Sequence, residues 1–287
     1  MAGAKQDTRQ KMINMMYLVF IAMLALNISK EVLATLGLIN DDIAQATQDL
    51  VADSAEKYTT FDNNATNEYY RVAAENTPKI KVVTDAYYAY IESIKQGLIA
   101  SGENSYRMAR LDKTTGVVDT IVDYQTMDKS QYLDELFFEG ELYTEKGKEF
   151  TARFSSFPSQ IQTVLDDFIA ADLEKDPATE ALPEGEYADF DFSFLSDLNQ
   201  RFAYSEEVLN RDGKYVPYLN YHFEGFPLIA SLSKLTKIQS DIRFVENKVI
   251  ENIINRINTS RKTPRSKHLV KGYAVSIISV IKNKLFV

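Results

Sequence analysis

The chain has 287 residues, of which 45% are hydrophobic and 25% are charged, so it is long enough for one or two folded domains and too hydrophobic for a disordered protein. It contains no cysteine, which excludes a disulfide framework and a thiolate metal site. The net charge of −9 is uneven: residues 258–287 hold seven Lys and Arg residues and no acidic residue, which leaves −16 on the first 257. An acidic body of this kind argues against nucleic acid as a partner.

The first predicted element is an apolar helix close to the N-terminus. Residues 12–28 carry no charged side chain, and a helix needs about 20 mostly apolar residues, with a lower limit near about 17, to cross a bilayer. Arg9 and Lys11 precede this run, and the positive-inside tendency places such a basic flank in the cytoplasm. We therefore predict that residues 1–29 form a short cytoplasmic N-terminus and one transmembrane helix of the bacterial inner membrane, with the rest of the chain in the periplasm. A cleavable signal peptide is the alternative, although no Pro or Gly follows the run before Gly37.

The residues of this helix also suggest what it contacts. Arg9 lies one turn before the apolar run, where a guanidinium is costly unless it reaches water or meets a carboxylate. The run itself contains no acidic residue, so a proton-binding carboxylate would have to come from another chain. Arg9 is therefore either an ordinary flanking cation or the partner of an acidic residue on a neighbouring membrane helix. The candidate residues for packing of this helix are Asn14, Tyr17, Ala22, Ala25 and Ser29, since small residues let a second helix approach closely.

For residues 30–257 the sequence predicts a periplasmic bundle of long antiparallel helices. The first helix is predicted from an apolar stripe at alternating steps of four and three, which we expect to be buried: Val32, Leu36, Ile39, Ile43, Ala46 and Leu50. The stripe continues the phase of Ala22, Ala25 and Ser29, so we expect one helix to run from the membrane into the bundle with little or no break.

Further helices are predicted from residues that typically start and end helices. Residues 76–78, Asn-Thr-Pro, predict the start of a helix that ends at Ser101 and Gly102. Residues 106–126 fit a helix and a hairpin equally well. Helical periodicity returns from Ser130 and again over residues 142–154, and the serines before Pro158 predict another start.

Residues 175–257 are predicted to contain a loop, an extended or packed segment and one long helix, and a basic tail follows them. Residues 175–185 are predicted to be a loop, and residues 189–223 to form extended edges or an aromatic packed loop. Pro227 then opens the longest predicted helix, whose apolar residues keep a period of 3.5 for about 30 residues, or ~45 Å: Leu228, Leu232, Leu235, Ile238, Ile242, Val245, Val249 and Ile253. Residues 258–287 form an atypical basic tail, which is either a membrane-surface segment or a foreign terminus.

Motifs for catalysis are missing from the sequence. The two histidines, His222 and His268, are too few for a histidine metal cluster and lie in an aromatic segment and in the basic tail. No glycine-rich phosphate loop occurs. The adjacent acidic pairs are typical of solvated helix faces in a chain with 41 acidic residues. We predict a protein that is not an enzyme and that carries no cofactor or metal.

Two segments resemble a known family. The N-terminal block MAGAKQDTRQKMINMMYLVFIAMLALNISKEVL and the long helix GFPLIASLSKLTKIQSDIRFVENKVI are similar to the GldM/PorM family, the motor subunit of gliding motility and type IX secretion. The resemblance implies a homodimer whose membrane helices sit inside a ring of GldL-type subunits, where proton flow rotates the dimer and drives protein transport. It also implies that Arg9 matches the family's membrane-embedded arginine, which faces an intramembrane carboxylate of the partner.

The chain departs from this family at its C-terminal end. Family members continue into β-rich periplasmic domains that reach outer periplasmic components of the machinery, whereas this sequence ends soon after the helical part. We therefore expect either a truncated version or a variant without the output domains. Two other classes remain as alternatives: a signal-anchored extracytoplasmic helical sensor, and an energiser subunit of the ExbD or MotB type, although the latter brings an intramembrane aspartate that this helix lacks.

Overall fold

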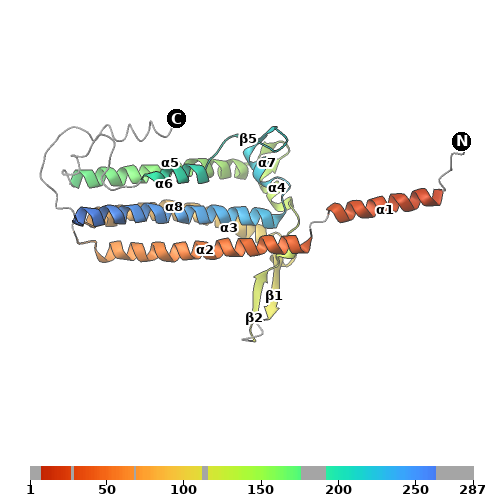
Figure 1. Ribbon diagram of the computed structural model, residues 1–287, viewed down its shortest axis with the longest axis horizontal. Helices are drawn as coiled ribbons and strands as arrows, with labels where there is room; N and C mark the ends of the chain where they lie inside the picture. The colour runs from red at the N-terminus through yellow and green to blue at the C-terminus, as the bar shows by residue number, and fades with distance from the viewer. Residues whose placement is uncertain (1–7, 27–28, 68, 112–115, 176–191, 263–287) are drawn as a thin grey trace.

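The computed structural model describes residues 8–26, 29–67, 69–111, 116–175 and 192–262. Helices α1 (Thr8–Leu26), α2 (Lys30–Asn63), α3 (Arg71–Ala100), α5 (Glu145–Lys175) and α8 (Leu228–Lys262) are the long elements. Short helices are α4 (Gln131–Phe137), α6 (Ser193–Arg201) and α7 (Tyr218–Phe223). Figure 1 shows that α2, α3, α5 and α8 lie side by side in a bundle, whereas α1 lies beyond one end of it, here called the α1 end. The mainly helical fold class is confirmed.

The helix that was predicted to enter the bundle with little or no break is interrupted before α2. Ser29 has extended backbone angles, φ −66° and ψ 142°, and separates α1 from α2. Its hydroxyl accepts a hydrogen bond from the Val32 N–H at 3.3 Å, which satisfies one of the four amide donors that a helix start leaves without a partner. Ser29 therefore begins α2 as its N-cap.

The direction of each long helix follows from its contacts. Between α3 and α5, the rings of Tyr87 and Phe157 lie 5.1 Å apart, and the Arg153 guanidinium lies over the Tyr90 ring. Residue numbers thus rise along one helix as they fall along the other, so this pair is antiparallel as predicted.

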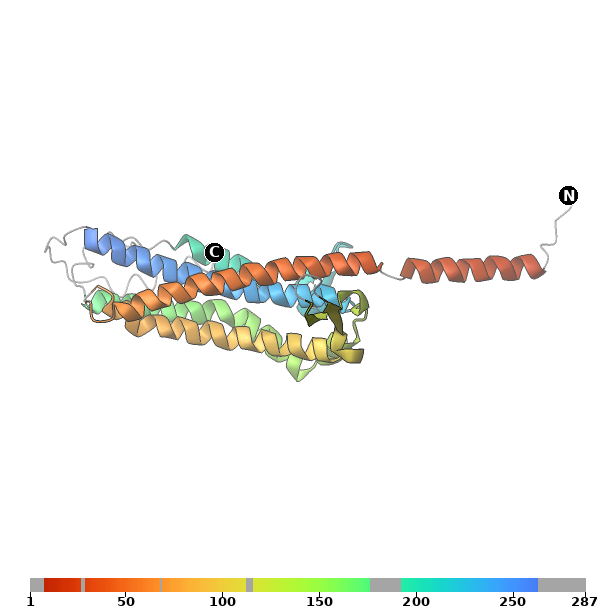
Figure 2. The same ribbon diagram turned by 90° about the horizontal axis from the view of Figure 1, so that it is seen from below.

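The pair α2 and α8 runs parallel instead. The Ser233 hydroxyl reaches the Leu36 carbonyl, and Asn247, further along α8, reaches Asp53, further along α2. Both helices begin at the α1 end, α2 after Ser29 and α8 where the Leu228 N–H donates to the Lys129 carbonyl at 2.8 Å. The prediction of antiparallel neighbours throughout is therefore wrong for this pair (Figure 2).

Two prolines lie inside helices where the sequence predicted helix starts. Helix α3 already begins at Arg71 and contains Pro78, and α5 runs without interruption through Pro158. A proline inside a helix removes one backbone hydrogen bond, but packing overrides this cost: Phe154, Phe157 and Ile161 are all buried around the second proline.

Three small antiparallel strand pairs complete the fold. Within residues 106–126, β1 (Arg107–Leu111) pairs with β2 (Val118–Val122), in register Arg107 to Val122, which favours the predicted hairpin over the predicted helix. The pairs β3 (Phe138–Glu139) with β4 (Leu142–Tyr143) and β5 (Glu207–Leu209) with β6 (Tyr215–Pro217) are shorter. The segment predicted to form extended edges or a packed loop, residues 189–223, contains the strands β5 and β6 but also the helices α6 and α7 in its described part.

Helix α8 lies in the middle of the core, as its apolar period predicted. Seven of its eight predicted apolar residues are buried: Leu228, Leu232, Leu235, Ile242, Val245, Val249 and Ile253. Ile238 is partly buried against the same core. The helix continues to Lys262, past the composition change at residue 258. The predicted loop at residues 176–185 and most of the basic tail, residues 263–287, lie outside the described residues.

The stripe predicted to be buried on α2 is only partly buried, since Leu36, Ile43 and Leu50 are half-buried and the other three residues are exposed. Val32 and Ile39 are 51% and 47% exposed, whereas the buried residues of α2 lie on a neighbouring face: Leu33, Gly37, Asn40, Thr47, Ser54 and Phe61. The reason is the chemistry of α8, which presents polar side chains to α2, so that α2 buries its small and polar residues there.

Candidate functional site

The residues predicted to act in the membrane are placed by the backbone of α1. Arg9 lies in the first turn of α1, and Ala22 and Ala25 lie in its second half, but the side chains of these three lie outside the described residues. Asn14 and Tyr17 are exposed on α1. Because the Arg9 side chain lies outside the described residues, its pairing with an acidic group stays a prediction.

As far as the helices are described, none combines the length and the apolar character that crossing a bilayer requires. The predicted span also includes residues 27 and 28, which lie outside the described part of the chain.

The bundle contains a row of buried and partly buried polar contacts between α2 and α8, which we call the polar seam. Its members on α2 are Asn40, Asp53, Ser54, Lys57 and Tyr58, and those on α8 are Ser233, Thr236, Glu246 and Asn247. These contacts hold the helix that follows α1 on the central helix of the bundle.

The end of the polar seam nearest to α1 is built around Asn40. The Thr236 hydroxyl donates to Asn40 Oδ1 at 2.7 Å, and Asn40 Nδ2 donates to the Tyr124 hydroxyl at 3.3 Å. Tyr124 in turn donates to Asp41, and burial together with Asp41 raises the pKa of the Tyr124 phenol. The Tyr124 ring lies directly on Gly37, where a Cβ atom would come within 2.0 Å of the ring. A residue without a side chain is therefore needed at this position.

The middle of the polar seam is a bridge through Asn247. Its Nδ2 donates to Asp53 Oδ2 at 2.5 Å, and its Oδ1 accepts from Lys57 Nζ at 2.9 Å. Lys57 also pairs with Asp53 at 2.8 Å. Hydrogen bonds from Lys57 and Asn247 lower the pKa of the Asp53 carboxyl. One amide thus joins an ion pair of α2 to the central helix.

The far part of the polar seam continues into an ion cluster that includes α3. Arg243 of α8 contacts Asp85 of α3 at 2.7 Å and Glu246 at 2.6 Å, and its guanidinium lies 4.5 Å from the centre of the Tyr88 ring. The Tyr58 hydroxyl of α2 donates to Glu246 at 3.0 Å. The cluster therefore joins α2, α3 and α8 at one level of the bundle.

The charges of this cluster stabilise one another. Burial alone would lower the pKa of the Arg243 guanidinium, but Glu246 and Asp85 raise it. Burial opposes ionisation of Asp85, yet hydrogen bonds from Arg243 and Lys81 hold its pKa below the usual range. Burial and the charge of Glu246 raise the pKa of the Tyr58 phenol, which therefore stays protonated as a donor. Such a cluster costs desolvation energy and specifies how its helices are placed.

The polar seam fixes register and offers no reactive group. In the residues that the structure describes, no set of three or more His, Cys, Asp or Glu side chains is placed to hold a metal ion. Sequence reasoning missed the seam, although a pattern was present: Leu33, Asn40, Thr47, Ser54 and Phe61 recur every seven residues, which is the spacing of a helix packed along one partner helix.

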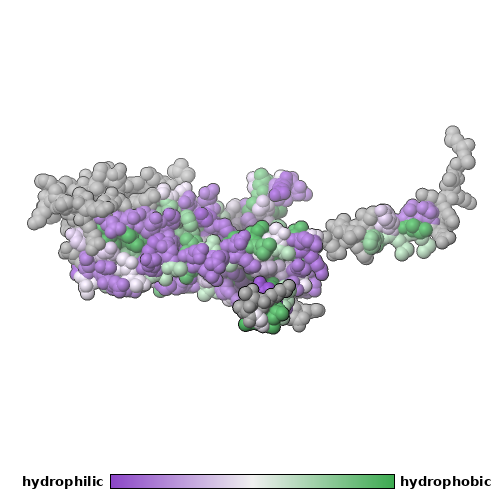
Figure 3. Space-filling model, turned by 60° about the horizontal axis from the view of Figure 1, so that its bottom comes forward, coloured by the Kyte–Doolittle hydropathy of each residue, from purple (hydrophilic) through white to green (hydrophobic). Residues whose placement is uncertain are grey.

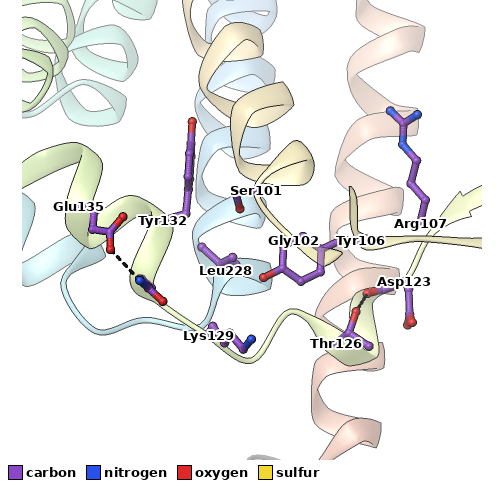
Figure 4. A pocket seen from close by; sticks show the side chains of 11 residues that line it. Ser101, Gly102, Tyr106, Arg107, Asp123, Thr126, Lys129, Tyr132, Glu135 and Leu228 are labelled. Atoms are coloured by element: carbon purple, nitrogen blue, oxygen red, sulfur yellow. Dashed lines mark hydrogen bonds between the residues drawn. The ribbon is translucent and has the colours of Figure 1, made fainter. Parts of the chain in front are cut away.

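A pocket lies near the α1 end of the bundle (Figure 4). Its volume is about 420 Å³, and its lining comes from the end of α3, the base of the β1–β2 hairpin, α4 and the start of α8. Arg107 and Lys129 bring positive charge to it, while Asp123 and Glu135 bring negative charge. Glu135 accepts a hydrogen bond from Gln131 at 2.7 Å. The pocket thus carries balanced charge and favours neither an anion nor a cation.

One family model matches the chain. The model described as the GldM N-terminal domain matches residues 31–256, which extend from the start of α2 to the last turns of α8. Among curated proteins, a search finds no significant match. The matched residues are those of the helical bundle with its polar seam.

Proposed function

Since the chain belongs to the family of the GldM N-terminal domain, a component of gliding motility and type IX secretion, we propose that it is the inner-membrane motor subunit of that machinery. In this proposal two copies form a dimeric, rotor-like unit inside a ring of GldL-type subunits. Proton flow through the ring turns the dimer, and the periplasmic bundle passes the movement to outer periplasmic components.

The observation that carries the proposal is the family match over the bundle together with the sequence that precedes it. The matched region begins directly after the apolar run of residues 12–28. That run contains no carboxylate, so the proton-binding acid has to belong to the partner, and Arg9 is the cation placed to meet it. A guanidinium and a carboxylate attract each other strongly at low dielectric, which makes such a pair sensitive to protonation of the acid.

The polar seam supports the mechanical part of this proposal. A rotation that arrives through α1 enters the bundle by α2, because α2 follows α1 in the chain. Helix α8 holds α2 at two separate levels: Thr236 bonds to Asn40, and about three turns further along Glu246 and Asn247 bond to Tyr58 and Asp53. We infer that torque reaches α8 through these contacts without a change of register.

The test uses Arg9 in cells that depend on this chain for secretion or gliding. Arg9→Ala should abolish secretion and gliding while the purified variant keeps the far-ultraviolet circular dichroism and the melting temperature of the unchanged protein. Arg9→Glu should be at least as damaging, because it opposes two acids at low dielectric. Retained secretion in Arg9→Ala would overturn Arg9 as the coupling residue.

Lys11→Ala is the matched control, since it removes a cation from the same basic flank two residues away. It should leave secretion intact. Co-purification in detergent with a membrane protein that carries an intramembrane carboxylate, followed by subunit counting, tests the partner. A charge swap that combines Arg9→Glu with an arginine at the partner's carboxylate should restore complex formation, although not proton flow.

A further inference from the structure

The walls of the pocket in Figure 4 are held by backbone hydrogen bonds and by close packing. The Leu228 N–H donates to the Lys129 carbonyl at 2.8 Å, and the Asp123 N–H donates to the Tyr106 carbonyl at 2.7 Å. The Tyr106 ring lies on Gly102, where a Cβ atom would come within 2.3 Å of it. The pocket volume of about 420 Å³ falls in the range of about 300–1,000 Å³ that small-molecule sites occupy. The pocket is therefore a preformed space large enough for a small polar ligand or a lipid headgroup.

The backbone at this pocket is strained. Ser105 and Tyr106 have φ angles of 54° and 46°, in the left-handed region that residues other than glycine rarely adopt. Among the described residues they are the two non-glycine positions with a positive φ. Such strain persists only where the surrounding contacts hold it, and it is concentrated at ligand sites. The fold therefore accepts a cost at this position that a purely structural turn would avoid with glycine.

Two cations and two carboxylates line the pocket. Figure 4 shows Glu135 on the α4 side, Arg107 and Asp123 on the hairpin side, and Lys129 between them. In the part of the chain that the structure describes, none of these four side chains forms an ion pair. Both signs of charge are therefore available to a ligand at separate places in one pocket.

Two long helices meet at the pocket with ends of opposite polarity. Ser101 and Gly102 follow the carboxyl end of α3, and Leu228 begins α8. The carboxyl end of a helix carries about half a negative charge, and the amino end about half a positive charge. The first N–H groups of α8 already donate to the carbonyls of Lys129 and Met127, so this helix end contributes a field and not free donors. The pair of helix ends stabilises an ammonium and an anionic group together, which selects a zwitterion over a simple anion or cation.

The pocket lies at the level where α2 begins. Helices α2 and α8 are parallel, and the Ser233 hydroxyl reaches the Leu36 carbonyl. Leu228 precedes Ser233 by as many residues as Glu31 precedes Leu36, so Leu228 lies about level with the first turn of α2. In the proposed function α1 spans the membrane, and this level is then next to the lipid headgroups.

An apolar surface adjoins the pocket. Arg107 belongs both to the pocket lining and to the β1–β2 hairpin. Further along this hairpin Met108, Leu111 and Val118 are exposed. Figure 3 shows hydrophobic atoms on the hairpin, beside a largely hydrophilic bundle surface. A ligand with a zwitterionic head and an apolar tail thus finds a matching surface for each part.

We propose that the pocket binds the headgroup of a zwitterionic phospholipid, whose acyl chains lie toward the β1–β2 hairpin. Arg107 and Lys129 bind the phosphate, and Asp123 and Glu135 bind the ammonium group. The lipid gives the bundle a second attachment to the bilayer, beside the connection through α1. The choice of a lipid rests on the proposed function, in which α1 spans the membrane, whereas the choice of a zwitterion rests on the pocket itself.

The experiment counts lipids retained by the purified full chain in an uncharged detergent, by native mass spectrometry. The probes are phosphatidylethanolamine and phosphatidylglycerol with the same acyl chains. Phosphatidylethanolamine should bind at least about ten times more tightly, because phosphatidylglycerol lacks the ammonium group that the carboxylates bind. Glycerophosphoethanolamine has the zwitterionic headgroup without acyl chains and tests a ligand taken from solution. If it binds as tightly as the lipid, the lipid is overturned as the occupant.

Three variants locate the bound lipid. Glu135→Gln should reduce the affinity for phosphatidylethanolamine about tenfold and leave that for phosphatidylglycerol unchanged, since it removes a contact to the ammonium group alone. Arg107→Gln should weaken both lipids, because both carry the phosphate. Arg110→Gln is the matched control: it lies on the same hairpin, is exposed and pairs with Asp119 outside the pocket, and it should change neither affinity. All three residues are exposed, and unchanged circular dichroism checks the fold.

Equal retention of the two lipids by the unchanged chain overturns the inference. So does a preference for phosphatidylethanolamine that survives both Glu135→Gln and Arg107→Gln, because the lipid is then bound elsewhere, for example along α1. Lipid retention is measured without secretion, which separates this inference from the proposed function. No lipid preference together with an inactive Arg9→Ala overturns the lipid site and leaves the motor in place. A preference that depends on Glu135, together with an active Arg9→Ala, supports the lipid site and overturns the coupling role of Arg9.

Discussion

Two sides of the bundle are held together by different means. Where α5 packs on α3 and on the end of α6, the contacts are aromatic: the Phe157 and Phe202 rings lie 4.7 Å apart, and Tyr87 lies 5.1 Å from Phe157. Where α8 packs on α2 and α3, the contacts are the hydrogen bonds and ion pairs of the polar seam and of the ion cluster that continues it. Burial of aromatic rings supplies much of the free energy of folding, whereas a buried polar contact contributes little net energy but costs much when one partner is lost.

This difference suggests a division of roles. The aromatic side gives the bundle its stability and tolerates approximate geometry. The polar side requires one register of α2 on α8, because a shift along the helix would separate Asn247 from Asp53 and Glu246 from Tyr58. Under the proposed function, in which movement enters through α2, the side that fixes register is the side on which α2 lies.

The largest expected effect comes from the aromatic side. Phe157→Ala removes a buried ring that contacts Tyr87 and Phe202, and the free energy of unfolding should fall by about 4 kcal/mol. Urea unfolding followed by circular dichroism measures this change. Val82→Ala, at an exposed position of α3, is the control and should change stability by less than about 0.5 kcal/mol. A loss below about 1 kcal/mol for Phe157→Ala would contradict the central place of the aromatic side.

The next effect tests the polar side. Arg243→Met leaves Glu246 buried without its cation and Asp85 with Lys81 alone, and should cost about 3 kcal/mol. Adding Glu246→Met removes the unpaired charge, so the double variant should recover part of that loss in the same urea titration. No such rescue is available on the aromatic side. If the double variant is less stable than Arg243→Met, the cluster stabilises the fold and does not merely specify it.

The sequence predicted α8 better than α2, and the polar seam explains why. In α8 the apolar period marks the buried face, because these residues belong to the hydrophobic core of the bundle, and seven of eight residues were placed correctly. In α2 the same kind of period predicted a helix but the wrong face. Periodicity indicates that one face of a helix is apolar and suited to burial. It does not say which other element packs against that face.

The candidate site was less predictable than the fold. Arg243, Asp85 and Tyr58 come from three helices that are far apart in the sequence, and no local pattern brings them together. The two internal prolines also led to wrong predictions of helix starts, because Pro78 and Pro158 have the sequence context of a first helical turn. The buried neighbours in the fold explain why the helices continue through them. Local chemistry predicted the elements, and long-range packing decided their limits and faces.

The smallest effect separates the two sides by their response to acid. On the aromatic side, burial and the charge of Lys234 lower the pKa of His222 from its usual 6.5 to about 4. The unfolded chain therefore binds more protons between pH 4 and 6.5, so His222 lowers stability as the pH falls through this window. On the polar side, Asp53 and Asp85 have pKa values below the usual carboxyl range, so their contribution is lost only at lower pH.

His222→Gln should therefore remove part of the acid sensitivity without changing the polar seam. Because His222 is only partly buried, solvent screening reduces the effect to about 1 kcal/mol of the stability difference between pH 6.5 and pH 4. Urea midpoints for both proteins at pH 4, 5, 6.5 and 8 give this difference, and the two curves should run parallel above pH 6.5. If the variant keeps the full acid sensitivity, the loss of stability above pH 4 belongs to the polar seam. The side that fixes the register of α2 would then be the first to yield to acid.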